Sequence, residues 1–279
     1  MLSLPGSRAA LLRQELIARN RSYANSNGLP HVMSYGELPV VVYQQSECGR
    51  HHGNFIPASY RAILGEPRWR KRLGKVHAQG RRCLPARDGP WHELDSSVSS
   101  DALLMNIFCH PRITSRADLC GILGVERGSR PEFGFRPRVP LLSGAMERTE
   151  IDMKLGNVLF EAKLPEADFQ AQRTELVEGY RNFREVFAGR QLPRIGKKYA
   201  SYQLIRNILA AYALDFDFCA LIDARRPDLI EDCYAVFCCV RSAELRVRCK
   251  LLTWQELAGC LPPFPRNFLN VKYGIIPAG

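Results

Sequence analysis

The chain has 279 residues, 46% of them hydrophobic, so it is long enough to bury a substantial core. Its 39 Lys and Arg residues outnumber its 28 Asp and Glu residues, and the formal charge of +11 makes a polyanion such as nucleic acid the first partner to consider. No apolar stretch approaches the roughly 20 residues of a membrane span, residues 1–20 lack a signal-peptide core, and no CxxC spacing occurs, so we expect a cytoplasmic protein with reduced cysteines and no membrane partner.

The first part of the chain is predicted to be a basic extension. Residues 8–20 have the spacing of an amphipathic helix, and residues 37–44 are strand-like. Between Arg50 and Arg82, nine basic residues accompany one acid, Glu66, with aromatic residues between them. This composition fits a surface that grips nucleic acid, and it fits equally well a solvated helix packed on a core. The candidate nucleic-acid-binding residues are Arg61, Arg68, Arg70, Lys71, Arg72 and Lys75.

A Gly-Pro break and a serine-rich run within residues 87–97 predict a domain boundary. We place the basic N-terminal region at residues 1–92 and a second domain at residues 93–279. The order of elements in the second domain predicts an α/β fold with a central mixed sheet flanked by helices. These elements are a helix capped by Ser99 or Ser100, a hairpin at 149–163, helices at 168–187 and 201–214, strands at 216–223 and 233–240, an extended piece at 245–252, and a short helix starting at Thr253.

The segment TEIDMKLGNVLFEAK, residues 149–163, is predicted to form a β-hairpin around a Gly156–Asn157 turn. That register places Asp152 opposite Glu161, and Lys163 on the same face as both. Opposed carboxylates repel each other unless a cation lies between them. A hard cation such as Mg²⁺ prefers oxygen ligands, which the two carboxylates and the backbone carbonyl of Ala162 would supply. Lys163 would orient or help deprotonate a water molecule, or neutralise charge on a phosphate.

Two other interpretations of the hairpin stay open. Acids and lysines also pair across exposed hairpins, where each pair contributes at most about 1 kcal/mol. Alternatively, Asp152-Met153-Lys154 would supply the acid-x-lysine pair, but the ERTEI segment before it is a poor buried strand. We therefore prefer Glu161-Ala162-Lys163.

At these residues the sequence resembles the PD-(D/E)XK superfamily of restriction-endonuclease-like nucleases. Asp152 takes the place of the first acid, and Glu161-Ala162-Lys163 that of the acid-x-lysine element, although Ile151 stands where the family pattern has Pro. The resemblance covers about the C-terminal two-thirds of the chain, and the segments SSDALLMNIF, YQLIRN and LTWQEL resemble bacterial restriction-endonuclease-like proteins of uncharacterised function.

The resemblance implies a restriction-endonuclease-like core and a Mg²⁺- or Mn²⁺-dependent nuclease that hydrolyses phosphodiester bonds. DNA is the expected substrate, RNA is the alternative, and a homodimer is left open. The resemblance also suggests Gln203 as a further catalytic residue and Asp101 as a further metal ligand, although Asp101 also suits a first-turn acid favoured by the helix dipole. The competing functional class is a non-catalytic nucleic-acid-binding protein on a nuclease-like fold.

Overall fold

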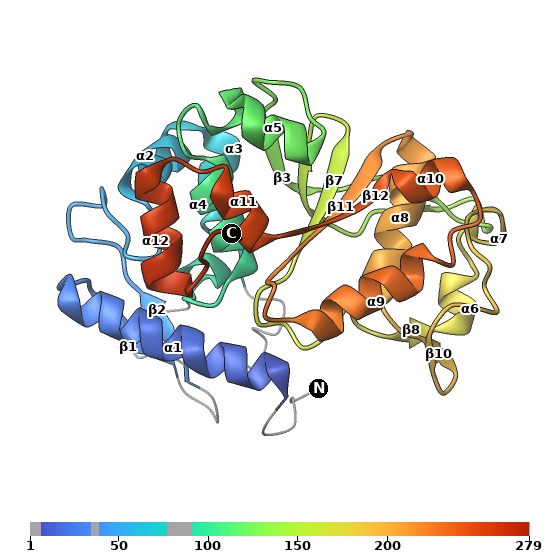
Figure 1. Cartoon of the computed structure of the whole chain (residues 1–279), viewed down its shortest axis with the longest axis horizontal. Helices are drawn as coiled ribbons and strands as arrows, with labels where there is room; N and C mark the ends of the chain where they lie inside the picture. Colours follow the sequence, from blue (N-terminus) through green and yellow to red (C-terminus); the bar gives the residue numbers. More distant parts are fainter. Residues whose placement is uncertain (1–6, 35–38, 77–90, 279) are drawn as a thin grey trace. The chain divides into compact units, whose positions relative to one another are not determined.

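The computed structural model describes residues 7–34, 39–76 and 91–278, which form two compact units (Figure 1). We call Cys120–Trp254 the sheet unit. The described residues up to Leu119, together with those from Gln255 onward, form the helical unit. The compact units therefore divide the chain at places other than the boundary near residue 92 expected from the sequence. The reason is that the 3-10 helix η1 (Glu93–Asp95) and helix α4 (Ser100–Phe108) pack with the elements before residue 77.

The sheet unit is built on a mixed five-stranded sheet, which confirms the predicted α/β fold class. Its strand order is β12-β11-β7-β6-β3. The strands β3, β6 and β7 are antiparallel neighbours, whereas β7, β11 and β12 run parallel. All five residues of β7 are buried, as expected for a central strand covered on both faces. The bounds are β3 Pro131–Phe135, β6 Ile151–Leu155, β7 Val158–Ala162, β11 Asp217–Ile222 and β12 Cys249–Thr253.

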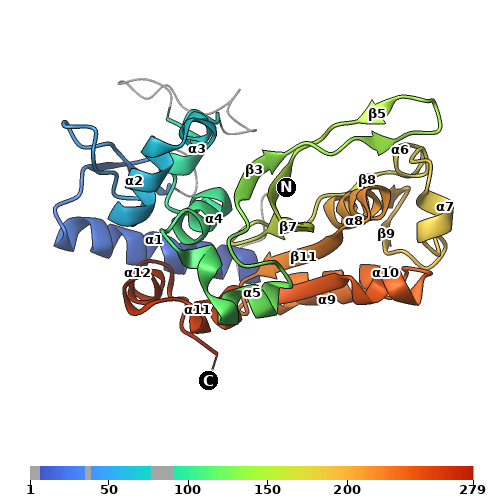
Figure 2. The same ribbon diagram turned by 90° about the horizontal axis from the view of Figure 1, so that it is seen from above.

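Two helices make the parallel crossovers and cover one face of this sheet (Figures 1 and 2). Helix α8 (Tyr202–Leu214) connects β7 to β11, and helix α9 (Pro227–Phe237) connects β11 to β12. Right-handed crossovers in one direction along a sheet place both helices on the same side. Their apolar residues share one core cluster with Leu159 and Phe218. Because side chains alternate along a strand, Leu159, Glu161 and Lys163 all point toward the α8 side of β7.

A small three-stranded sheet of order β8-β10-β9 lies in the same unit (Figure 2). Its strands are β8 Gln172–Arg173, β9 Arg194–Ile195 and β10 Lys198–Tyr199. The remaining elements of the sheet unit are short: β4 Val139–Pro140, β5 Met146–Glu147, α6 Thr174–Val177, α7 Phe183–Val186 and α10 Ala243–Val247.

Three secondary-structure predictions were wrong, one of them in part: the extended piece expected at 245–252 begins within helix α10, and only its second half forms β12. Residues 168–187 are not one helix, because neighbouring segments take up their backbone hydrogen bonds: β8 pairs with β10, and Arg181 N donates to Pro140 O at 3.0 Å. Residues 233–240 are not a strand but largely the end of α9. Pro227 begins that helix, and the buried residues Leu229, Cys233 and Val236 repeat at helical spacing.

The helical unit combines a β-ribbon with helices from both ends of the chain. Strand β1 (His31–Met33) pairs antiparallel with β2 (Val41–Tyr43). Ser99 caps α4 as predicted, since its hydroxyl accepts from Ala102 N at 3.1 Å. The C-terminal helix α12 packs against α1, so the two ends of the chain share one unit. The helices are α1 Arg8–Ser26, α2 Pro57–Gly65, α3 Pro67–Arg72, the 3-10 helix η2 Ile113–Ser115, α12 Pro263–Tyr273, and two that cross the unit boundaries, α5 Ala117–Leu123 and α11 Trp254–Gly259. No helix in the described parts of the chain is long and apolar enough to cross a bilayer.

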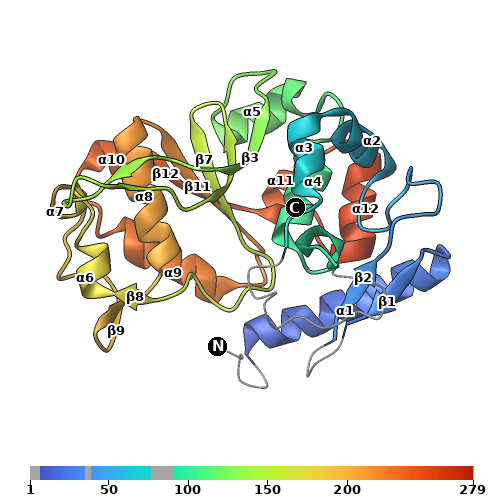
Figure 3. The ribbon, with the colours of Figure 1, turned by 180° about the vertical axis from the view of Figure 1, so that it is seen from behind.

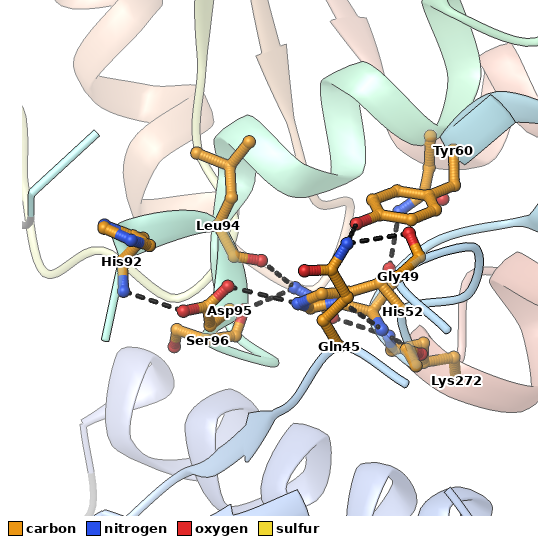
Figure 4. A network of polar contacts seen from close by, with 12 residues as sticks. Gln45, Gly49, His52, Tyr60, His92, Leu94, Asp95, Ser96 and Lys272 are labelled. Atoms are coloured by element: carbon orange, nitrogen blue, oxygen red, sulfur yellow. Dashed lines mark hydrogen bonds and ion pairs between the residues drawn. The ribbon is translucent and has the colours of Figure 1, made fainter. Parts of the chain in front are cut away.

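A buried polar network ties this unit together (Figure 4). Lys272 is fully buried, and its side-chain Nζ donates to Gly53 O at 3.1 Å and to Asn54 Oδ1 at 2.6 Å. The ring of Tyr43 lies 4.1 Å from the same nitrogen. Burial holds the pKa of Lys272 well below its ordinary value. In the same network, His52 Nε2 lies 3.1 Å from Asp95 Oδ1.

Candidate active site

The predicted hairpin is present with the predicted turn. Leu155 pairs with Val158 and Met153 with Phe160, and Gly156 has the positive φ of +56° that favours glycine in such a turn. The regular pairing ends just before Asp152. There the carboxylate takes over the role of a backbone acceptor, because Asp152 Oδ2 accepts from Ala162 N at 2.8 Å.

The opposite edge of β6 is interrupted at the same residue. Strand β3 pairs Phe133 with Met153 and Phe135 with Ile151, but Gly134 and Asp152 between them do not pair. Gly134 has a φ of +66°, a left-handed conformation that only glycine adopts easily. The sheet is therefore irregular on both sides of Asp152, as is common beside functional sites.

Glu161 is buried, and each of its carboxylate oxygens accepts one hydrogen bond. Only 1% of its surface is exposed; Oε1 accepts from Lys163 Nζ at 2.8 Å, and Oε2 accepts from Asn207 Nδ2 at 2.7 Å. Burial opposes ionisation of this carboxyl, but the charges of Lys163 and Arg206, with the hydrogen bonds from Lys163 and Asn207, keep its pKa below its ordinary value. The group is a carboxylate at neutral pH.

Lys163 is held in place through both its side chain and its backbone. Besides Glu161, Nζ donates to Gln203 Oε1 at 2.9 Å and lies 5.5 Å from the centre of the Phe169 ring. Its backbone N donates to Leu221 O, and its backbone O accepts from the indole of Trp254, both at 2.8 Å. Burial alone would lower the pKa of Lys163, but the negative charges of Glu161, Glu166 and Asp152 raise it above its ordinary value. The group is an ammonium in this structure.

Helix α8 supplies the second wall of the site. Gln203 and Asn207 are one turn apart and therefore lie on the same face of the helix, where they contact Lys163 and Glu161. Arg206 Nε donates to Asn207 Oδ1 at 3.0 Å, which turns the amide nitrogen of Asn207 toward Glu161. Gln203 N also donates to Phe169 O at 3.0 Å. These contacts fix the helix start relative to the end of β7.

The loop after β7 is fixed by an arginine that the sequence did not reveal. Arg226 is fully buried, and its guanidinium donates to Glu166 O at 2.5 Å and to Ala167 O at 3.0 Å. Glu166 Oε2 in turn accepts from Leu164 N at 2.5 Å. The Arg226 guanidinium also pairs with Asp228 at 2.8 Å, but no local pattern could have identified its role in the loop, because the two carbonyls it binds there are about 60 positions away in sequence.

The structure brings Asp152, Glu161, Ala162, Lys163 and Gln203 together, whereas Asp101 belongs to the helical unit. In the parts of the chain that the structure describes, no three His, Cys, Asp or Glu side chains form a group that could hold a metal ion. A metal at this hairpin would therefore rest on two carboxylates and a backbone carbonyl.

Asp101 and part of the predicted basic surface neutralise each other. Asp101 Oδ2 accepts from Arg72 Nη2 at 2.8 Å and from Lys75 Nζ at 2.7 Å, and Lys75 also pairs with Glu93 at 3.1 Å. Although burial opposes it, the charges of Asp101 and Glu93 raise the pKa of Lys75. The other four candidate binding residues are exposed: Arg61, Arg68, Arg70 and Lys71. Arg81 and Arg82, at the end of the basic run, lie outside the described residues.

The alternative acid-x-lysine pair is not assembled at this site. Lys154 Nζ donates to Glu132 Oε1 at 2.8 Å and lies 5.3 Å from the Phe135 ring, on the edge strand side of the hairpin. Lys163, by contrast, contacts Glu161 directly. The geometry favours Lys163 as the lysine of the pair.

Comparison with known proteins gives one family match. The model of a family described as "Restriction Endonuclease associating with ARP" (REase-ARP) matches residues 21–274. Neither the curated proteins nor the solved structures that were searched gave a match.

Proposed function

Because the chain belongs to the REase-ARP family, whose description suggests a nuclease-type function, we propose that it is a metal-dependent nuclease hydrolysing phosphodiester bonds, with DNA as the substrate. The observation that carries this proposal is the buried Glu161–Lys163 pair beside Asp152. This pair is not a solvent-exposed ion pair, since the side chains of Glu161 and Lys163 are only 2% and 6% exposed.

The residues present fit a magnesium or manganese ion by the chemistry of their donors. Asp152 and Glu161 offer carboxylate oxygens and Ala162 offers a carbonyl oxygen, the ligands that hard cations prefer. Such an ion would polarise the phosphate and stabilise the charge that develops on it. Asp101 is left out of this set, because Arg72 and Lys75 already neutralise it within the helical unit.

The chain's own residues position the other reactant. The ammonium of Lys163 is a hydrogen-bond donor suited to orienting the attacking water molecule and to stabilising negative charge on the phosphate. Gln203 holds that ammonium from α8, and Asn207 holds Glu161. Water adds to phosphorus and one backbone P–O bond breaks, which leaves a phosphate monoester and a hydroxyl group.

Cleavage of supercoiled plasmid, single-stranded DNA and RNA, each with Mg²⁺, Mn²⁺ or EDTA, tests the proposal. We expect the wild type to cut plasmid only with a divalent cation, and Asp152→Asn and Lys163→Met to lose this activity while still binding DNA. Lys154→Met is the matched control, because it removes a lysine from the same hairpin that contacts Glu132 instead of Glu161. This variant should cut like the wild type.

Three results would contradict the proposal or one part of it. If Lys154→Met were inactive and Lys163→Met active, the acid-x-lysine pair would be Asp152-Met153-Lys154. If the wild type bound DNA but cut none of the substrates with either cation, the protein would be a non-catalytic nucleic-acid-binding protein on a nuclease-like fold. Cleavage of RNA alone would assign RNA as the substrate.

A further inference from the structure

The small sheet β8-β10-β9 carries an unusual group of positive charges. Lys198 on β10 lies directly opposite Arg173 on β8, and Lys197 lies in the turn that joins β9 to β10, after Gly196 with a φ of +57°. All three basic side chains are exposed. Like charges directly opposite each other destabilise a sheet, so this arrangement is unfavourable for folding alone. We call Arg173, Lys197 and Lys198 the basic platform.

The carboxylates of the sheet unit do not neutralise the basic platform. Within the described residues, no ion pair joins Arg173, Lys197 or Lys198 to an acid. The nearby acid Glu178 is used elsewhere: it accepts from the Tyr199 hydroxyl at 2.8 Å and lies 3.8 Å from Arg194. The three charges therefore remain available for an anionic partner.

The basic platform is joined to the candidate active site through its two strands, the edge strand β8 and the central strand β10. Strand β8 begins three residues after Phe169, whose ring lies against Lys163, and β10 ends four residues before Gln203, which binds the same ammonium. The two connections are also bonded to each other, since Tyr202 N donates to Gln170 O at 2.8 Å. An extended chain spans about 3.5 Å per residue, so the end of β10 lies within about 14 Å of Gln203.

The β9–β10 hairpin is placed where a large ligand can reach it. The hairpin projects outward from the sheet unit (Figure 3). The aromatic ring at its base, Tyr199, is fully buried, so the basic platform offers charge without an exposed ring on which unpaired bases could stack. Charge without stacking favours a partner whose bases are already paired.

From these observations we propose that the basic platform binds the phosphate backbone of duplex DNA and sets the position of the strand at Lys163. This inference rests on the proposed nuclease function, since it names the surface that presents the substrate to that site. Backbone phosphates are spaced about 3.4 Å per strand along the duplex axis, so the upper bound of about 14 Å between the end of β10 and Gln203 corresponds to at most roughly four base pairs. Contacts on the basic platform would fix which bond reaches the site.

The test compares two variants that each remove three exposed positive charges. The first replaces the basic platform: Arg173→Gln, Lys197→Gln and Lys198→Gln. The second is the matched control on α3, in the region the sequence suggested as the grip: Arg68→Gln, Arg70→Gln and Lys71→Gln. Both variants lower the net charge by the same amount. A difference in DNA affinity between them therefore reflects the surface that was changed and not the net charge of the protein.

The first readout is binding of a fluorescently labelled DNA duplex in EDTA over a series of salt concentrations. We expect the basic platform variant to weaken binding about tenfold or more and to reduce the slope of log K against log salt by about 2 to 3, since each lost phosphate contact lowers it by about 0.9. The α3 variant should change both quantities less. In cleavage, the basic platform variant should raise KM and leave kcat near the wild-type value.

Several results would overturn the inference. The first is a loss of DNA affinity in the α3 variant that equals or exceeds the loss in the basic platform variant. The second is an unchanged salt slope in the basic platform variant. The third is an equal loss of affinity of the basic platform variant for single-stranded DNA, which would exclude a duplex-specific surface. A failure of the nuclease proposal can be distinguished from a failure of this inference. If the nuclease proposal fails, the wild type binds duplex DNA and does not cut it. If only this inference fails, the wild type still cuts DNA and the basic platform variant binds and cuts like the wild type.

Discussion

The buried pair Glu161–Lys163 makes a direct prediction about stability. The two side chains are 2% and 6% exposed, and their charged atoms are 2.8 Å apart. Removing one partner of a buried ion pair typically costs about 3 to 5 kcal/mol, because the other charge stays buried without compensation. Lys163→Met keeps a side chain of similar length, so little of the loss would come from a cavity. Since Arg206 still stabilises the ionised Glu161, we expect a loss near the lower end, about 3 kcal/mol.

The double variant Glu161→Gln/Lys163→Met separates the missing charge from the missing contacts. It removes both charges, and Gln can still accept from Asn207. We expect it to recover about 1 kcal/mol or more of the stability lost in Lys163→Met, so that the effects of the two substitutions are clearly non-additive. Lys154→Met, whose partner Glu132 is 46% exposed, should cost less than about 1 kcal/mol.

Urea unfolding followed by circular dichroism, at neutral pH and in EDTA so that no divalent cation contributes, measures these differences. The reasoning would be refuted if Lys163→Met lost no more stability than Lys154→Met. It would also be refuted if the double variant were less stable than Lys163→Met, because an uncompensated Glu161 could not then be the source of the loss.

Three further predictions concern other parts of the molecule. Burial lowers the pKa of Lys272 in the folded protein, so between this lowered pKa and the unfolded pKa of about 10.5 the unfolded chain binds one more proton than the folded chain. The free energy of unfolding of the wild type should therefore rise with pH in this window by up to about 1.4 kcal/mol per unit. Lys272→Met should flatten the rise in unfolding experiments from about pH 7 to about 9.5. Gly134→Ala should lower the free energy of unfolding by about 1 to 2 kcal/mol, because alanine resists a φ of +66°; a loss below a few tenths would contradict this. Asn207→Ala should reduce kcat more than DNA affinity, because Asn207 holds Glu161; an unchanged kcat with weakened binding would argue against that role.

The sequence was most informative where a short pattern has one structural solution. The Gly156–Asn157 turn determines the hairpin register, and alternation along the strand then places Glu161 and Lys163 on one face. Ser99 as the cap of α4 and the helix at 201–214 follow from equally local rules. These features need no information from distant parts of the chain.

The sequence was least informative where residues distant in the chain determine the secondary structure or the partners of a side chain. The apolar run at 233–240 has strand-like composition, yet its residues complete the buried face of a helix that Pro227 begins. Likewise, the neutralisation of Asp101 by Arg72 and Lys75 depends on the packing of helices about 30 residues apart in sequence. Arg226 could not be identified because its role exists only once the loop after β7 has folded against α9.

The helical unit contains segments from both sides of the sheet unit in the sequence, and this has a consequence for synthesis on the ribosome. Helix α1 cannot pack against α12, and the Tyr43 ring cannot contact Lys272 Nζ, until residues 263–273 have been translated. The sheet unit, residues 120–254, is complete earlier and can fold as a continuous piece of chain. We therefore expect the hairpin that carries the candidate site to fold first, whereas the apolar faces of the earlier helices stay unpacked until α12 has been synthesised.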